Sequence, residues 1–173
     1  TMTSVSSRPI FRALLVCALI LFAGFPAAAQ SNDSKGEGNS GERFASLRAD
    51  EVNVRAGPGV RYQVKGFFVR KHLPVRITAD FESWRKIKDS EGAEGWVHRA
   101  MLSGKRTVIV TGEIMTLRRS PEDTAPAVAR LAPGMVAEVE TCQPEWCGVT
   151  ASSYSGWIRR KGLWGLKEKE IIE

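Results

Sequence analysis

Reactive side chains are scarce in this sequence, and two cysteines are the first to consider. Cys142 and Cys147 enclose the short segment 143–146. A metal site would need further ligands close by, and a redox pair is typically spaced C-x-x-C. Two cysteines separated in this way suit facing positions across a β-hairpin, where the distance between Cα atoms allows a disulfide. We therefore expect a structural disulfide between Cys142 and Cys147, and no metal site.

The rest of the sequence does not offer the combination of residues that a catalytic site needs. A cysteine peptidase needs a histidine base beside its thiolate, but we expect His72 in a turn and His98 at an exposed strand end. A glycosidase needs two carboxylates about 5–9 Å apart in a cleft. Several acidic residues fall instead in turn-like stretches, as a solvated edge would: Glu82, Asp89, Glu91 and Glu94. We therefore expect no enzymatic activity and no cofactor.

The N-terminus predicts export. Arg8 and Arg12 precede an apolar run over residues 13–25, and the alanines at 27–29 offer a small-residue cleavage site. The run has about 13 residues, whereas a spanning helix needs about 20. The sequence therefore indicates a signal peptide over residues 1–29 rather than a membrane anchor or a buried helix. We expect a periplasmic or secreted protein that meets the membrane only before cleavage.

The charge pattern speaks against a nucleic-acid partner. The net charge is +6, and it would fall to +4 once Arg8 and Arg12 are removed with the signal peptide. Acidic and basic residues are mixed, which is unlike the basic stripe of a nucleic-acid-binding protein. Residues 30–43 are rich in Ser, Asn, Gly and charged residues, which predicts a flexible linker.

The rest of the chain repeats itself. Residues 44–58 align without a gap on residues 107–121, and Trp84 and Trp96 then align with Trp146 and Trp157. A period near 62 residues indicates two copies of a small domain. We place repeat 1 at residues 44–103 and repeat 2 at residues 104–165, followed by a tail over 166–173 that forms one helical turn or frays.

Both repeats predict strands. Short runs rich in β-branched and aromatic residues, such as 75–77 and 136–139, alternate with turn signals such as 56–59 and 132–134. We therefore expect an all-β fold. Asp80 and Arg85 stand where repeat 2 has its cysteines, which predicts a weak ion pair there in place of the disulfide.

These motifs resemble those of a known family. In repeat 1, Asn-Val-Arg-Ala-Gly-Pro-Gly at 53–59 is followed by Trp84 and then by Glu-Gly-Trp-Val at 94–97. This order resembles the bacterial SH3-like (SH3b) domain, and repeat 2 is similar but lacks the Gly-Pro-Gly turn. The resemblance implies two tandem SH3-like, five-stranded, partly open β-barrels. It also implies export and, as in many members, binding of cell-wall peptides or glycans.

The glycines and tryptophans have expected places in such a barrel. Gly57 and Gly59 suit a tight loop around Pro58. We expect the glycine before Trp96, and its counterpart in repeat 2, to let the backbone bend closely under an indole. We expect Trp84 and Trp146 at the edge of the core. For Trp96 and for Trp157, core packing and contact with a ligand both stay open.

The remaining candidates point to binding. We expect five residues of repeat 1 to line one groove: Arg55, Arg61, Tyr62, Trp96 and Arg99. Aromatic faces beside arginines suit peptides or sugars that carry carboxylates, as muropeptides do; the alternative is an ordinary solvated face. The sequence thus predicts a non-catalytic cell-envelope module that recognises peptidoglycan or its peptide stems. The alternative is an adaptor that docks another envelope protein or regulates a separate wall hydrolase.

Overall fold

The computed structural model describes residues 43–173. The predicted signal peptide and residues 30–42 of the predicted linker lie outside the described residues. Arg43, placed at the end of the linker from the sequence, is instead the first residue of a strand. Within the described part, no helix is long and apolar enough to cross a membrane.

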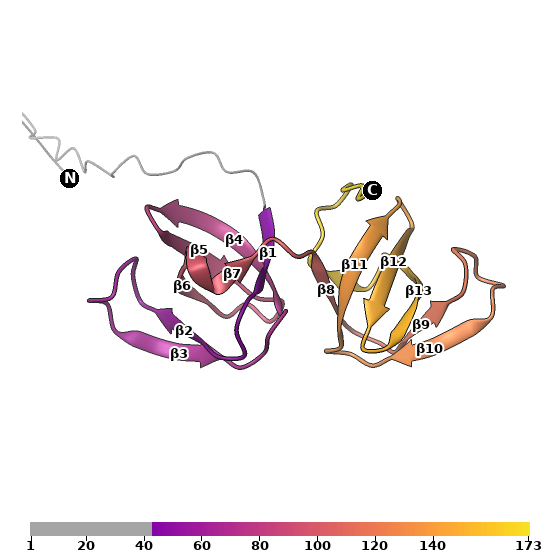
Figure 1. Cartoon of the computed structure of the whole chain (residues 1–173), viewed down its shortest axis with the longest axis horizontal. Coiled ribbons are helices and arrows are strands. Elements are labelled where there is room, and N and C mark those ends of the chain that lie inside the picture. The colour runs from indigo at the N-terminus through magenta and orange to yellow at the C-terminus, as the bar shows by residue number, and fades with distance from the viewer. Residues whose placement is uncertain (1–42) are drawn as a thin grey trace, which may run out of the picture. The chain divides into compact units, whose positions relative to one another are not determined.

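Repeat 1 forms one antiparallel sheet, drawn from indigo to red in Figure 1. Its strands are β1 (Arg43–Leu47), β2 (Val52–Arg55), β3 (Val64–Phe68), β4 (Pro74–Phe81), β5 (Trp84–Lys88), β6 (Glu94–His98) and β7 (Leu102–Ser103), with the 3-10 helix η1 (Arg99–Met101) before β7. Their order in the sheet is β3-β2-β6-β5-β4-β1-β7. The first and last strands of this order are not paired with each other, so the barrel is partly open.

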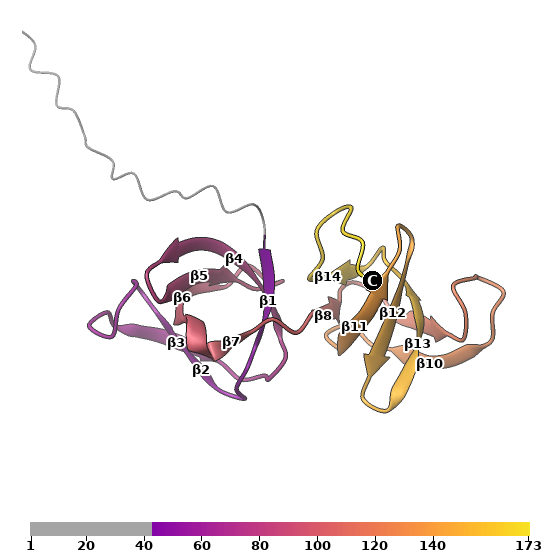
Figure 2. The same cartoon turned by 45° about the horizontal axis from the view of Figure 1, so that its top comes forward.

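Repeat 2 repeats this topology (Figure 2). Its strands are β8 (Thr107–Val110), β9 (Met115–Arg118), β10 (Ala127–Leu131), β11 (Val136–Cys142), β12 (Trp146–Ala151), β13 (Tyr154–Arg159) and β14 (Leu163–Trp164). Their order, β10-β9-β13-β12-β11-β8-β14, matches that of repeat 1 strand for strand. The all-β prediction with two tandem SH3-like barrels is therefore confirmed.

The strand count differs from the expected five. Each sheet has seven strands because the short segments that enter and leave the barrel also pair. In repeat 1, for example, β1 lies between β4 and β7. Each barrel encloses its own core, since alternate strand residues point inward. The core of repeat 1 consists of Leu47, Val52, Val54, Val75, Ile87, Val97 and Leu102.

Each barrel closes where a glycine lets two strands approach. A Cβ on Gly95 in β6 would lie 2.3 Å from Cγ1 of Val54 and 3.0 Å from the carbonyl oxygen of Arg55 in β2. A Cβ on Gly156 in β13 would lie 2.5 Å from the carbonyl oxygen of Arg118 in β9. The need for glycine at both positions therefore comes from the neighbouring strand, and the expected bend of the backbone under an indole stays a prediction.

The link across the β-hairpin differs between the repeats as predicted. Cys142 and Cys147 face each other across β11 and β12 and form a disulfide with an S–S distance of 1.99 Å. Asp80 and Arg85 occupy the equivalent facing positions in β4 and β5, and Arg85 Nε lies 2.5 Å from Asp80 Oδ1. The disulfide and the ion pair predicted from the alignment are both present.

Two further expectations concern a turn and the C-terminal tail. His72 has a φ of 66° and its counterpart Gly134 a φ of 82°, so the predicted left-handed turn is confirmed. The tail has no helical turn. Instead, Ile172 exchanges backbone hydrogen bonds of 2.8 and 3.1 Å with Cys142, and the Arg160 guanidinium donates to backbone carbonyls of Lys167 and Glu170.

The disulfide should stabilise repeat 2 measurably. It closes a loop with a sequence separation of 5, for which the chain-entropy relation gives about 2 kcal/mol. We expect reduction to lower the free energy of unfolding of repeat 2 by that amount, measured by urea denaturation with and without dithiothreitol. A Cys142→Ser/Cys147→Ser double variant should show the same loss and no further response to dithiothreitol. An unchanged unfolding midpoint on reduction would contradict this.

The close approach at β6 predicts a sharp contrast between two glycine substitutions. Gly95→Ala should destabilise repeat 1 by about 1–3 kcal/mol, because neither Val54 nor the Arg55 backbone can withdraw without disturbing the core. Gly66→Ala in β3 is the matched control, since its Cβ would meet nothing within 4 Å; it should change stability by less than about 0.5 kcal/mol. Equal effects of the two substitutions on urea denaturation would refute the argument.

Candidate functional site

An arginine braces the first long loop in each repeat. Arg55 is the last residue of β2, and its Nη1 donates to the carbonyl oxygens of Val60 at 3.1 Å and Tyr62 at 2.8 Å. Arg118 Nη1 donates in the same way to the carbonyl oxygen of Ala125 at 2.7 Å. Tyr62 and Ala125 are aligned positions, so the brace belongs to the repeated frame. Part of the donor capacity of Arg55 is thus used to hold the loop.

The glycine pair of the first loop makes room for an aromatic ring. A Cβ on Gly57 would lie 2.4 Å from Cδ1 of Tyr62, and one on Gly59 would lie 3.4 Å from its Cδ2. The Tyr62 ring therefore packs on the loop backbone while 47% of the residue stays exposed. Repeat 2 has neither the ring nor the Gly-Pro-Gly turn, and buried Ala125 takes the place of Tyr62.

Strand register brings aromatic and cationic side chains onto one outward face of repeat 1. Arg55 faces Trp96 across β2 and β6, and β5 and β6 pair Lys86 with Trp96 and Trp84 with His98. We call these five half-buried residues the tryptophan face. The rings of Trp84 and His98 meet edge to face with centroids 5.5 Å apart. Arg55 and Lys86 flank Trp96, and both indoles remain partly open to solvent.

One acidic residue borders this face and is neutralised. Lys86 Nζ lies 3.0 Å from Glu94 Oε1. The hydrogen bond from Lys86 and its positive charge lower the pKa of the Glu94 carboxyl. Glu94 is therefore ionised and paired near neutral pH, and it leaves Arg55 and the indoles without a competing acid beside them.

The five residues expected from the sequence to form one groove are partly brought together. Arg55 and Trp96 are neighbours across two strands, and Tyr62 lies on the loop that Arg55 braces. Arg61 is exposed on the same loop. Arg99 begins η1, beyond the end of β6, and no hydrogen bond or ring contact among residues 43–173 joins its side chain to the other four. Whether these residues bind a ligand remains a prediction.

The equivalent face of repeat 2 is closed. The Arg159 guanidinium lies 4.4 Å from the centroid of the Trp146 ring and covers it, so Trp146 is only 6% exposed. Arg159 also pairs with Glu145 Oε2 at 2.5 Å and with the Asp123 carboxylate. These hydrogen bonds raise the pKa of Arg159 and lower that of Asp123. Arg159 is therefore already occupied, whereas Arg118 faces half-buried Trp157 as Arg55 faces Trp96.

The positions that close repeat 2 hold different residues in repeat 1. His98 stands where repeat 2 has Arg159, and exposed Val60 stands where it has Asp123. Lys86 aligns with Gly148, over which Trp157 lies, since a Cβ there would be 3.8 Å from the indole. The same barrel thus leaves Trp84 half-buried in repeat 1 and has Trp146 sealed by Arg159 in repeat 2, whereas Trp157 is half-buried like Trp96.

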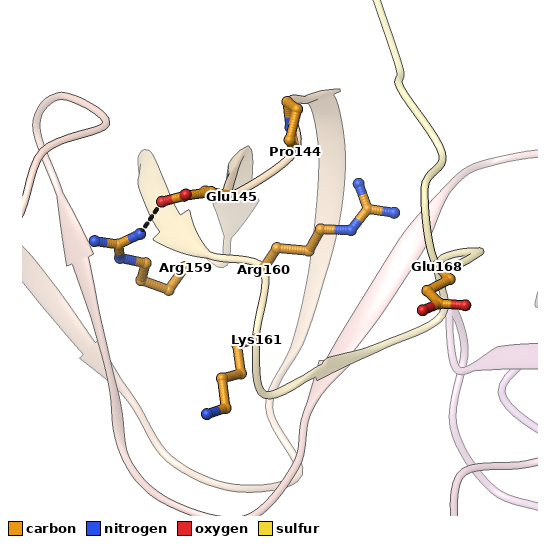
Figure 3. A pocket seen from close by; sticks show the side chains of 6 residues that line it. All are labelled: Pro144, Glu145, Arg159, Arg160, Lys161 and Glu168. Carbon is orange, nitrogen blue, oxygen red and sulfur yellow. Dashed lines mark hydrogen bonds and ion pairs between the residues drawn. The ribbon is translucent and has the colours of Figure 1, made fainter.

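A surface pocket of about 720 Å³ lies beside the sealed face of repeat 2 (Figure 3). Its lining combines opposite charges: Pro144, Glu145, Arg159, Arg160, Lys161 and Glu168. The Arg159 guanidinium points toward Glu145 in Figure 3, and Arg160 is held by tail carbonyls. Of its cations, only Lys161 has no hydrogen bond or ion pair with the described residues, which makes this pocket a poor site for an anion.

Charge also separates the two repeats. Residues 52–79 of repeat 1 include six basic residues and no acidic one, whereas residues 115–141 of repeat 2 include three basic and four acidic residues. Within the described part of the chain, no group of three or more His, Cys, Asp or Glu side chains could hold a metal ion. The basic excess of repeat 1 therefore lies in β2, β3 and most of β4 with their loops, while residues 80–98, which carry both indoles, include five acidic and three basic residues.

Sequence reasoning missed the closing arginine, although the signal was present. Trp84 aligns with Trp146, and His98 aligns with Arg159. Trp84 faces His98 across two adjacent strands of repeat 1, and Trp146 faces Arg159 in the same way in repeat 2. Facing side chains on one sheet face interact. A cross-strand pairing of these four residues would have predicted an Arg–Trp contact in repeat 2 and a His–Trp contact in repeat 1.

Similar proteins include enzymes of greater length. The protein described as "Putative N-acetylmuramoyl-L-alanine amidase YrvJ" from Bacillus subtilis (strain 168) is 25% identical over 156 residues, which are 84% of this chain and 29% of that protein. Two solved structures from Trichomonas vaginalis are similar. NlpC2 is 9% identical over 72% of this chain and 48% of its own, with a TM-score of 0.33. NlpC1 is 12% identical over 77% of this chain and 49% of its own length, with a TM-score of 0.35.

The chain thus spans less than a third of the YrvJ protein and about half of each solved structure. A family match is more specific. Residues 48–104 and 111–165 each match the family described as "Bacterial SH3 domain". These two ranges cover the two barrels except for their first strands, β1 and β8, and contain the aligned tryptophans and closing glycines of both. The chain belongs to the bacterial SH3 domain family.

Proposed function

We propose that this chain is a non-catalytic module of the cell envelope, which binds peptidoglycan through its peptide stems on the tryptophan face of repeat 1. One observation carries the proposal: Trp84 and Trp96 are both half-buried on one face of repeat 1, while Arg159 covers Trp146 in repeat 2. Partly exposed indoles beside cations suit a ligand that offers carboxylates and apolar surface together.

The loop braced by Arg55 extends the proposed site. Tyr62 and Arg61 lie on this loop, next to the strand end that bears Arg55. Arg61 makes no hydrogen bond or ion pair with residues 43–173, so its guanidinium is available to a carboxylate. Arg99 would contribute at the far end of β6. Stem peptides carry carboxylates along a short extended chain, which matches cations spread along one face rather than gathered at one point.

The non-catalytic part of the proposal has its own support. The two cysteines of the described chain form a disulfide, so neither offers a thiolate. His98 uses its Nδ1 to accept the Ala100 N–H at 3.2 Å and packs its ring on Trp84. The protein described as a putative amidase is much longer than this chain, and we propose that this chain lies in the cell envelope but does not share that reaction. The disulfide favours an oxidising, extracytoplasmic compartment.

Sedimentation with intact sacculi tests the proposed face. Trp96→Ala in residues 30–173 should weaken binding about tenfold, or about 1.4 kcal/mol, because the variant removes an exposed aromatic surface beside Arg55. Arg61→Ala should weaken it in the same direction. The readout is the fraction of protein remaining in the supernatant after centrifugation, over a series of sacculus concentrations.

Trp157→Ala is the matched control, because Trp157 occupies the aligned position of the sealed repeat. It should change binding less than about twofold, with all variants checked by circular dichroism. Equal losses for Trp96→Ala and Trp157→Ala would place binding elsewhere. Solubilisation of sacculi by the wild-type protein alone would overturn the non-catalytic part of the proposal.

If the site recognises carboxylates, binding should depend on the free carboxyl groups of the sacculi. Sacculi whose carboxyl groups have been converted to amides should bind about tenfold more weakly than untreated sacculi at an ionic strength of about 0.01 M, where screening extends to about 30 Å. Raising the salt to about 1 M should weaken binding to untreated sacculi and bring the two preparations together. Equal binding to both preparations at low salt would show that carboxylates are not recognised.

A further inference from the structure

Strand β3 is an open edge of repeat 1. It stands first in the strand order and pairs only with β2, and no strand lies on its other side in either Figure 1 or Figure 2. An edge strand presents unpaired backbone N–H and C=O groups that can hydrogen-bond to another extended chain. Among the residues the structure describes, nothing covers this edge.

Apolar side chains along this edge are peculiar to repeat 1. Phe67 is 60% exposed and Val69 is 67% exposed. Their aligned counterparts at the β10 edge of repeat 2 are Arg130 and Ala132. Because the fold is the same, the barrel itself does not require large apolar residues here. An exposed apolar edge strand invites aggregation, so its presence in one repeat indicates a use.

A pocket lies next to the edge. It has a volume of about 310 Å³ and is lined by Val54, Lys65, Gly66, Phe67, Phe68, Ala93 and Glu94. A Cβ on Gly66 would meet nothing within 4 Å, which means that the space beside β3 is open. Val54 and Phe68 belong to or pack on the barrel core, so an apolar side chain entering the pocket would contact the core surface directly.

The charges around β3 are positive and available. Arg61, Lys65 and Lys71 lie just before, within and just after the strand, and none makes a hydrogen bond or ion pair with residues 43–173. The one acid of the pocket, Glu94, is paired with Lys86. A partner strand with acidic residues would therefore meet unpaired cations, whereas a basic one, including a second copy of β3, would be repelled.

We propose that β3 of repeat 1 binds an extended, acidic and apolar segment of another envelope protein, which adds to the sheet as an eighth strand. Backbone hydrogen bonds along β3 supply the affinity that is independent of sequence. Consecutive strand residues point to opposite faces, so the pocket over Gly66 accepts the apolar side chains on one face of the added strand. The alternate carboxylates lie on the opposite face, where they reach Lys65 and its cationic neighbours. This surface shares Arg61 with the proposed wall-binding site but none of the five residues of the tryptophan face, and it needs no wall ligand.

Titration with designed peptides tests this surface. The probes are a fluorescent peptide of about eight residues that alternates valine and glutamate, a counterpart that alternates valine and lysine, and a glutamate peptide N-methylated at alternate amides. Residues 30–173 should bind the glutamate peptide saturably, with a dissociation constant below about 1 mM, by fluorescence anisotropy. The lysine and N-methylated peptides should bind at least about tenfold more weakly.

Two variants locate the binding on β3. Gly66→Val fills the pocket, and Lys65→Glu reverses the charge that meets the carboxylates; each should weaken the glutamate peptide at least about tenfold. Ile114→Arg is the matched control, since Ile114 is 63% exposed and lies in repeat 2; it should leave the affinity unchanged. Gly66→Val should also leave sacculus binding unchanged, which separates this proposal from the proposed function.

Three outcomes would overturn the proposal. The first is no saturable binding of the glutamate peptide by the wild-type protein. The second is equal binding of the lysine peptide, which would show no charge preference, or no effect of Gly66→Val, which would show that the peptide does not bind at β3. The third is a wild-type dimer in sedimentation velocity that Gly66→Val dissociates, because the occupant of the edge would then be a second copy of this chain.

Discussion

Each barrel depends on the close approach of two strands that are far apart in the sequence. In repeat 1, β2 and β6 meet at Gly95, where any side chain would collide with Val54 and the Arg55 backbone. Gly156 has the same role against Leu117 and Arg118 in repeat 2. This contact sets the end of β2, and with it the position from which Arg55 reaches the loop carbonyls and faces Trp96. The possible binding face is therefore a consequence of how the barrel closes.

Upon this shared frame the two repeats have diverged at a few positions. Where repeat 1 has His98 and Val60, repeat 2 has Arg159 and Asp123, which cover an indole and join the loop to the sheet. Exposed ion pairs of this kind contribute little stability individually. Their effect is to occupy the cation and the ring, which removes both from a ligand. Repeat 2 gains its own support from the disulfide, whereas repeat 1 keeps a weaker ion pair and an open surface.

The sequence alone predicted what depends on local pattern and on the internal alignment. The repeats, the turn at His72, the disulfide and the Asp80–Arg85 pair follow from residue type and spacing, and the structure has all of them. It did not predict features that depend on strand register. The partner of Gly95, the brace from Arg55 and the cover over Trp146 each join residues whose proximity is known only once β2, β5 and β6, or their counterparts, are paired.

The central claim is that ligand access differs between two equivalent faces, and the indole N–H signals of the five tryptophans report on it directly. In a two-dimensional ¹⁵N–¹H spectrum of residues 30–173, titration with a soluble muropeptide should shift the indole signals of Trp84 and Trp96. Those of Trp146, Trp157 and Trp164 should stay in place. Shifts confined to Trp146 and Trp157, or of equal size in both repeats, would contradict the account.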